Sequence, residues 1–235
     1  MVAFSLASIV VAASVVLAAP SIKTSGCDIS KAKISIPSSQ TALVQPTLAP
    51  SYVSVAIGIQ NYTCTDADVP KYKSAGAVAE LFDISCLVGT STFNRIQDDV
   101  FIVWKLLPKQ LTAAKVVELL HFAKTPTILG QHYFIINPLT GVGISPKWDF
   151  TSQGATKGNP NAFVVGARTG SLAAPTGPQD VDWLSLSNAQ GQLADQIYRV
   201  DTRGGQPPAS CAPGSAPIFV KYASKYWLFG GSIHH

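Results

Sequence analysis

The sequence predicts one all-β domain, a sandwich or closed barrel of short antiparallel strands with a small helical insertion near residues 95–125. First, short segments rich in Val, Ile and aromatic residues recur after residue 50. Second, Gly, Pro, Asn and Asp separate these segments, as turn residues do in sandwiches and barrels. Third, 47% of the 235 residues are hydrophobic and 13% are charged, which is enough to fill a core and excludes charge-driven disorder.

The N-terminal residues are typical of a secretory signal peptide. Residues 1–18 carry no charged side chain, and Ser8–Ala19 is an apolar run too short to span a bilayer. We expect cleavage after Ala18, no membrane segment in the mature chain, and secretion to the extracellular space. Residues 19–50 are polar and interrupted by proline, so they are expected to form an extended lead-in to a single β-rich domain over 51–235.

The later elements follow in order. Ser51–Cys64 is rich in Val, Ile and Tyr and indicates a first strand, and the β-branched end of Ala75–Val88 favours a second. Thr112–Lys124 has apolar residues at helical spacing behind a threonine N-cap and before Pro126, and Ile96–Leu106 is a weaker helix. Six further short strands are expected at Gln131–Ile136, Lys147–Phe150, Phe163–Ala167, Trp183–Leu186, Ile197–Thr202 and Ile218–Phe229.

A set of motifs in the domain is shared with one known family. The most specific is Ile197–Cys211 (IYRVDTRGGQPPASC), and the others are Gly58–Cys64, Ala79–Asp83, Gly130–Tyr133, Lys147–Asp149 and Asp182–Leu184. Together they resemble DUF3455, a family of fungal and bacterial secreted proteins of unknown function, over about residues 50–229. With the helical insertion, the resemblance implies a fungal extracellular protein. It brings no known activity and no known functional residues.

The cysteines and one sequon indicate modifications of the secretory pathway. Four cysteines in the expected mature chain predict two disulfides, for which three pairings are possible. We predict Cys64–Cys211, which would join the first and last parts of the sheet and lies in the two clearest motifs of the resemblance, and Cys27–Cys86 for the remaining pair. The alternatives are Cys27–Cys64 with Cys86–Cys211, and Cys27–Cys211 with Cys64–Cys86. Asn61 begins an Asn-Tyr-Thr sequon and is a candidate glycosylation site.

Several enzyme and binding classes lack their motifs. Members of DUF3455 are often labelled malate dehydrogenase, but the one glycine-rich candidate, Gly141–Pro146, lacks the third glycine and does not open a helix. We expect neither a nicotinamide nor any other cofactor. The sequence contains no Gly-x-Ser-x-Gly and no His-Glu-x-x-His motif, and its four histidines do not suggest a metal site. A net charge of +4 without a run of three basic residues argues against nucleic acid as a partner.

Five residues are candidates for a functional site. His132 and Asp149 lie on neighbouring predicted strands and could form a proton-transferring pair near Trp148, although the sequence favours His132 as a core residue that joins one strand to another. Trp148, Trp183 and Arg199 are candidate ligand-binding residues, because indole rings stack on ligands and arginine binds carboxylates and phosphates. An aspartate two positions after Arg199 is expected to face the same side of its strand.

These observations favour a secreted, disulfide-bonded fungal protein of the cell surface or wall. It would bind a cell-wall polymer or a small ligand rather than catalyse a reaction. The alternative is an unclassified secreted hydrolase or lyase that uses His132 with Asp149. The sequence does not predict the oligomeric state.

Overall fold

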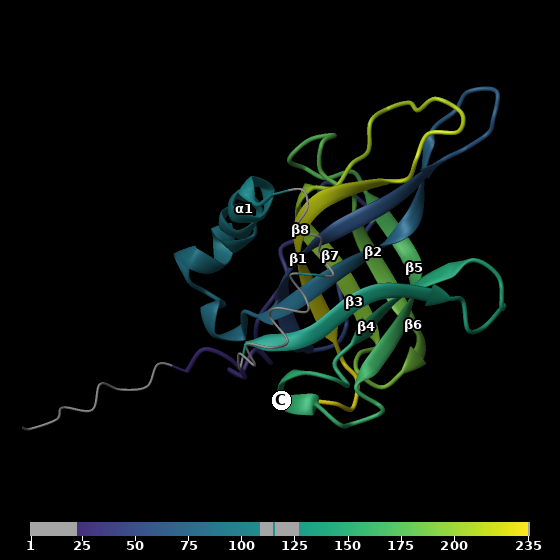
Figure 1. Ribbon diagram of the computed structural model, residues 1–235. Coiled ribbons are helices and arrows are strands. Elements are labelled where there is room, and N and C mark those ends of the chain that lie inside the picture. The colour runs from purple at the N-terminus through teal and green to yellow at the C-terminus, as the bar shows by residue number, and fades with distance from the viewer. Residues whose placement is uncertain (1–22, 109–114, 116–126, 235) are drawn as a thin grey trace, which may run out of the picture.

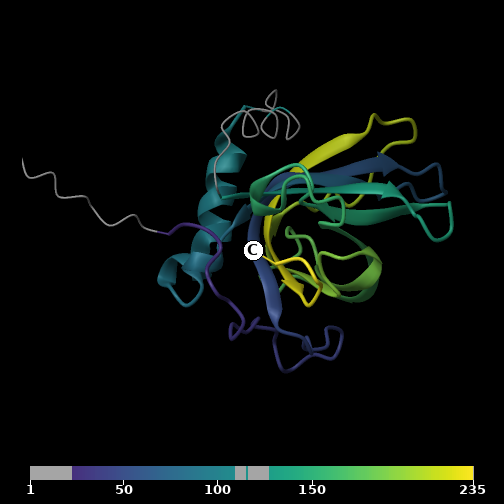
Figure 2. The ribbon, with the colours of Figure 1, turned by 90° about the horizontal axis from the view of Figure 1, so that it is seen from below.

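The computed structural model is a closed barrel of eight antiparallel strands, and it describes residues 23–108, 115 and 127–234. Each strand pairs with the next in the chain, and β8 closes the ring on β1 (Figures 1 and 2). The predicted all-β fold is therefore confirmed, in its barrel form. The strands are β1 (Pro50–Cys64), β2 (Tyr72–Asp83), β3 (Ile128–Ile136), β4 (Ile144–Asp149), β5 (Phe163–Leu172), β6 (Trp183–Gly191), β7 (Gln196–Gly204) and β8 (Ile218–Phe229).

The predicted elements agree with these strands except at a few ends. β2 stops at Asp83 instead of continuing to Val88, because the Asp83 carboxylate accepts hydrogen bonds from the backbone N–H groups of Gly26 and Ser85 and so fixes a turn. The 3₁₀ helix η1 (Ser85–Leu87) follows this turn, and a second one, η2 (Gly154–Thr156), follows β4.

The helix α1 (Ser91–Leu106) confirms the weaker of the two predicted helices and begins five residues earlier than expected. The hydroxyl of Thr90 accepts a hydrogen bond from the Phe93 backbone N–H, which is the usual N-cap arrangement. The other predicted helix, Thr112–Lys124, lies outside the described residues apart from Lys115.

Side chains alternate between the inside and the outside of the barrel. The inward-facing ones form an interior cluster in which aromatic and aliphatic residues of all eight strands meet. An eight-stranded barrel is just wide enough to be filled by side chains or to hold one small ligand. Members of the interior cluster on the strands include Tyr52, Ala56, Ala79, Leu81, Leu129, Trp148, Val164, Leu186, Ile197, Tyr222, Tyr226 and Leu228.

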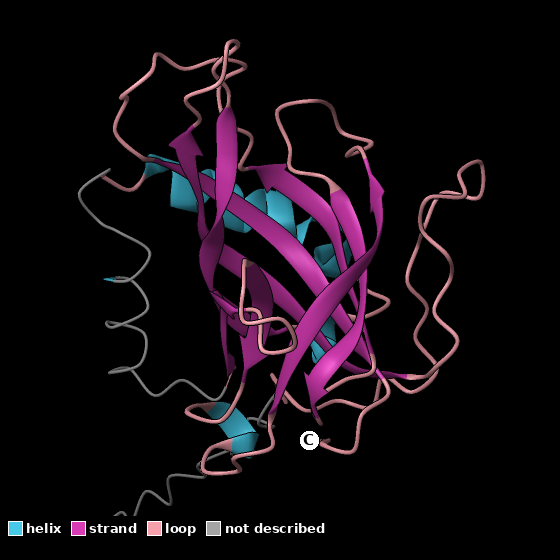
Figure 3. Cartoon of the chain, turned by 90° about the vertical axis from the view of Figure 1, so that its right-hand side faces the viewer, coloured by secondary structure: helices cyan, strands magenta, loops and turns pink. Residues whose placement is uncertain are grey.

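A second apolar cluster lies on the outer surface of β1, β7 and β8. The N-terminal segment 23–49 and α1 cover it, so this segment packs against the barrel rather than extending away from it (Figure 2). Figure 3 shows α1 in cyan against the strands. Buried members of this outer cluster include Ile29, Ile34, Leu43, Val53, Val55, Trp183, Tyr198, Val200, Trp227 and Phe229.

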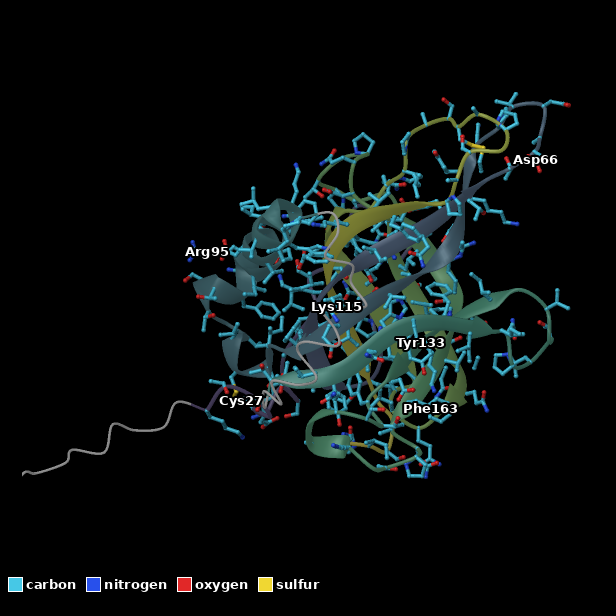
Figure 4. All side chains as sticks on the ribbon, viewed as in Figure 1. Cys27, Asp66, Arg95, Lys115, Tyr133 and Phe163 are labelled. Atoms are coloured by element: carbon cyan, nitrogen blue, oxygen red, sulfur yellow. A yellow bond between two sulfur atoms is a disulfide. The ribbon has the colours of Figure 1, made fainter. Side chains whose placement is uncertain are left out.

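Two disulfides join segments that are distant in the sequence. Cys27–Cys86 ties the N-terminal segment to η1, with Cα atoms 5.0 Å apart. Cys64–Cys211 joins the end of β1 to the loop before β8, with Cα atoms 5.9 Å apart, and is visible beside Asp66 in Figure 4. The predicted pairing is confirmed, and the two alternative pairings are wrong. None of the helices in the described ranges is long and apolar enough to cross a membrane.

Candidate functional site

One end of the barrel contains an open cavity of about 580 Å³. We call this end the mouth. The β1–β2 and β3–β4 hairpins lie on this side of the molecule (Figure 1), and the ends of all strands except β8 contribute to the lining. The volume is within the range of small-molecule sites in proteins, about 300–1,000 Å³.

Below the cavity, aromatic side chains fill the interior. The ring of His132 stacks on Trp148 with 4.5 Å between centroids, and Tyr226 contacts both at 5.3 and 5.4 Å. The hydroxyl of Tyr222 lies 3.3 Å from that of Tyr226. We call these four residues the aromatic plug, because their rings pack against one another across the barrel interior.

His132 belongs to this plug as a buried, neutral residue. Only 2% of its surface is exposed, and its Nδ1 lies 3.0 Å from the backbone carbonyl of Lys147. Since a carbonyl only accepts, Nδ1 carries the proton. Burial lowers the pKa of His132 to about 3; the hydrogen bond to Lys147 opposes this shift, and the charge of Arg199 adds to it. A base with so low a pKa is poorly matched to proton transfer near neutral pH.

Asp149 faces the opposite side of the sheet, so the predicted His132–Asp149 pair is not formed. His132 lies directly opposite Trp148 in the register, which turns the neighbouring Asp149 outward. There it accepts hydrogen bonds from Tyr133 Oη (2.6 Å) and Lys147 Nζ (2.8 Å), and Figure 4 marks Tyr133 on β3. Burial favours the neutral acid, but hydrogen bonds from Lys147, Thr151 and Tyr133 outweigh it and lower the pKa of Asp149 to about 2.

The two candidate tryptophans have different positions. Trp148 lies in the plug, 1% exposed, directly beneath the cavity, where its ring approaches Gly166 in the cavity lining. Trp183 points outward into the outer cluster under the N-terminal segment. Trp148 therefore supports the cavity floor, whereas the structure does not bring Trp183 to the site.

Arg199 is the candidate residue that reaches the cavity itself. In the register it lies between Leu184 on β6 and Tyr226 on β8, both of which face the interior. Its Nε and Nη2 donate to the backbone carbonyl of Asp182, at 3.0 and 2.9 Å. Arg199 forms no ion pair with a carboxylate anywhere in the described chain. A cation thus lies beside the aromatic plug, held in place by a neutral backbone group.

The aspartate after Arg199 does not share its side of the strand, contrary to expectation. A bulge between Val200 and Arg203 interrupts the pairing of β7 with β8, and Asp201 adopts a φ of 52° within it. The Asp201 carboxylate pairs on the outside with Lys225 Nζ at 2.8 Å. The bulge leaves Arg199 without a carboxylate partner inside the barrel.

Two further residues line the cavity that the sequence analysis did not identify as candidates. Gln60 and Tyr62 lie on the inward face of β1; Tyr62 Oη donates to the Gly205 carbonyl at 2.8 Å, and burial raises its pKa to about 12 against the opposing charge of Arg199. Gln60 is 5% exposed, and its Nε2 has no hydrogen-bond partner among the described residues. Gln60 could have been identified because it is a polar residue on the same face of an apolar strand as Ala56, where a core side chain is expected.

Asn61 lies on the other face of β1 and is partly exposed. This orientation is compatible with the predicted glycosylation, although the carboxamide oxygen is buried. Among the residues the structure describes, no group of three or more His, Cys, Asp or Glu side chains could hold a metal ion.

By its fold and cavity the chain is a disulfide-linked antiparallel β-barrel that is open at one end of its interior. It belongs to the family described as "Protein of unknown function (DUF3455)", whose model matches residues 45–230. The resemblance seen in the motifs is thereby confirmed. No curated protein and no solved structure matches the chain.

Proposed function

We propose that this protein is a secreted binding protein that holds a small ligand in the mouth of its barrel. The observation that carries the proposal is the 580 Å³ cavity with Arg199 at its inner end. A cavity of this size at one end of a barrel fits a small molecule better than a cell-wall polymer, which needs an extended surface groove. Burial and the outward orientation of Asp149 leave His132 without the partner that catalysis would require, so binding is favoured over hydrolysis or lysis.

The extracellular location is part of this proposal. The apolar N-terminal run supports it, and so do the two disulfides, which persist in oxidising compartments. We propose that the ligand is bound outside the cell by the folded, oxidised protein.

A cavity-filling substitution tests the proposal. Leu184 is half-buried in the lining, so Leu184→Trp places an indole in the cavity, and Ala189→Trp fills it from a second position on the same strand, β6. Leu106→Trp is the matched control, because Leu106 is 79% exposed on α1, outside the lining. The probe is 8-anilinonaphthalene-1-sulfonate, whose fluorescence rises in apolar sites, and circular dichroism verifies the fold of each variant.

The wild-type protein and Leu106→Trp are expected to bind the probe equally, and both cavity variants are expected to lose most of this binding. If all four proteins bind it alike, or if the wild-type protein does not bind it, the mouth is not a ligand site and the proposal is wrong.

A further inference from the structure

The cavity has a polar wall and an apolar wall that face each other. Gln60 and Tyr62 on β1 and Arg199 on β7 form the polar wall, with β8 between these two strands. Phe134 on β3 and Pro146 on β4 belong to the opposite side of the closed ring. Asn137 and Ser145 also line the β3–β4 side, but its larger side chains are apolar, so the cavity suits a ligand with one polar and one apolar side.

The polar wall offers hydrogen-bond donors that the described protein groups do not satisfy. Gln60 Nε2 is buried without a partner. Arg199 uses Nε and Nη2 on the Asp182 carbonyl, and its Nη1 has no hydrogen bond to a described residue. The buried Gln60 Nε2 is costly without an acceptor, and Arg199 is partly buried at the cavity, so a ligand that supplies oxygen acceptors to both side chains gains affinity.

The charge of the lining favours an anion. Its charged side chains are Arg168, Arg199 and Asp182, which leave one positive charge in excess. The Asp182 carboxylate accepts a hydrogen bond from Ser171 Oγ at 3.0 Å and forms no ion pair with Arg199 or another described residue. A planar guanidinium with free N–H groups matches the two oxygens of a carboxylate.

The apolar wall continues to the rim of the mouth. Leu139 is 69% exposed and Ile144 is 48% exposed, and both line the cavity at the β3–β4 hairpin. The same hairpin also exposes Ile136 and Val142. A hydrocarbon body that lies along this wall would remove these side chains from water.

Resting on the proposed binding function, we infer that the ligand is an amphipathic carboxylic acid. Its carboxylate accepts hydrogen bonds from Arg199 and Gln60, and its apolar body lies against Phe134 and the β3–β4 hairpin. This assigns the two walls to the two halves of one molecule.

Calorimetric titration of the intact oxidised protein with decanoate, 1-decanol and acetate tests the inference. We expect decanoate to bind at least about tenfold more tightly than 1-decanol, which has the same chain without the charge, and acetate to bind too weakly to detect. Arg199→Gln is expected to weaken decanoate roughly 10- to 100-fold and to leave 1-decanol unchanged. Arg199→Lys keeps the charge but loses the fork, so its loss should be intermediate. Gln60→Leu should also weaken decanoate selectively.

Arg95→Gln is the matched control, because Arg95 is 69% exposed on α1 and far from the lining (Figure 4). It is expected to bind both ligands as the wild-type protein does. If 1-decanol binds as tightly as decanoate and Leu184→Trp abolishes both, the cavity is a ligand site but the carboxylate assignment is wrong. The assignment is equally wrong if Arg199→Gln weakens both ligands to the same extent. If Leu184→Trp leaves the binding of both ligands intact, the proposed function fails as well.

Discussion

Replacing His132 should remove a specific part of the acid sensitivity of the fold. His132 is neutral in the folded barrel because its side chain is buried, and its pKa there is about 3. In the unfolded chain the pKa returns to its ordinary value near 6.5. Below pH 6.5, His132 therefore binds a proton in the unfolded state but stays neutral in the folded state. The stability that neutral His132 confers is complete above pH 6.5 and is lost as the pH falls toward 3.

The magnitude follows from the shift. Each pKa unit corresponds to about 1.4 kcal/mol, so the free energy of unfolding should fall by about 2.5 kcal/mol between pH 6.5 and pH 4.5 on account of this residue alone. Asp149, with a pKa lowered to about 2, acts in the same direction only at more acidic pH. The window from 6.5 to 4.5 therefore isolates the histidine from this carboxylate.

Two substitutions separate titration from packing. His132→Phe keeps an aromatic ring against Trp148 but loses the hydrogen bond to the Lys147 carbonyl. His132→Gln keeps an N–H donor for that carbonyl but loses the ring. Neither side chain titrates, so both variants should share the same flatter pH dependence whatever their absolute stability.

The assay is equilibrium urea unfolding followed by tryptophan fluorescence at intervals between pH 4.5 and pH 8. The quantity of interest is the difference in unfolding free energy between wild type and variant, in which contributions from groups common to both cancel. We expect this difference to shrink by about 1.4 kcal/mol per pH unit below pH 6.5. Parallel curves for wild type and both variants would refute the assignment of His132 as a neutral plug residue and would reopen a role for it as a charged group.

Three further outcomes are expected. Cys64→Ser combined with Cys211→Ser should lower the unfolding free energy by about 4–5 kcal/mol, because the bond closes a loop with a sequence separation of 147 residues; unchanged urea midpoints would contradict this. Burial raises the pKa of Glu80 to about 8, so the stability that protonated Glu80 confers on the folded state is lost between pH 4.5 and pH 8. The unfolding free energy of Glu80→Gln relative to wild type should therefore rise by roughly 2–4 kcal/mol from pH 5 to pH 8. No such rise is expected if Glu80 ionises normally. Edman sequencing of the secreted chain should begin at Ala19, and retention of residues 1–18 would contradict the signal-peptide assignment.

The strands could be predicted from the sequence because each carries its own local signal. Val, Ile and aromatic residues fix where a strand lies, and the turn residues between them fix where it ends. The end of β2 escaped prediction because it depends on the Asp83 carboxylate meeting Gly26, which is 57 residues away. The early start of α1 had a local signal, the N-cap hydroxyl of Thr90, which was overlooked.

The site could not be predicted to the same extent, because it depends on register. Trp148 pairs with His132, and a shift of one residue would have placed Asp149 opposite it instead. Similarly, an unbroken β7 would have placed Asp201 on the same side as Arg199, and only the bulge turns it outward. Neither the register nor the bulge is encoded by the residue types at these positions alone.

The division of the barrel into a filled part and a hollow part follows from the size of its inward-facing residues. Trp148 and Tyr226 belong to the plug, whereas the lining above them includes Gly166 and Ala189. Gly166 does not need a left-handed backbone, so its small size is not a demand of chain conformation; a Cβ there would lie 3.0 Å from the Trp148 ring and from the Leu186 side chain. Eight strands enclose room for side chains or for one ligand but not for both at the same level. Large aromatic rings therefore fill one part of the barrel interior, and small residues line the cavity next to it. The proposed ligand site lies in this cavity, beside Arg199.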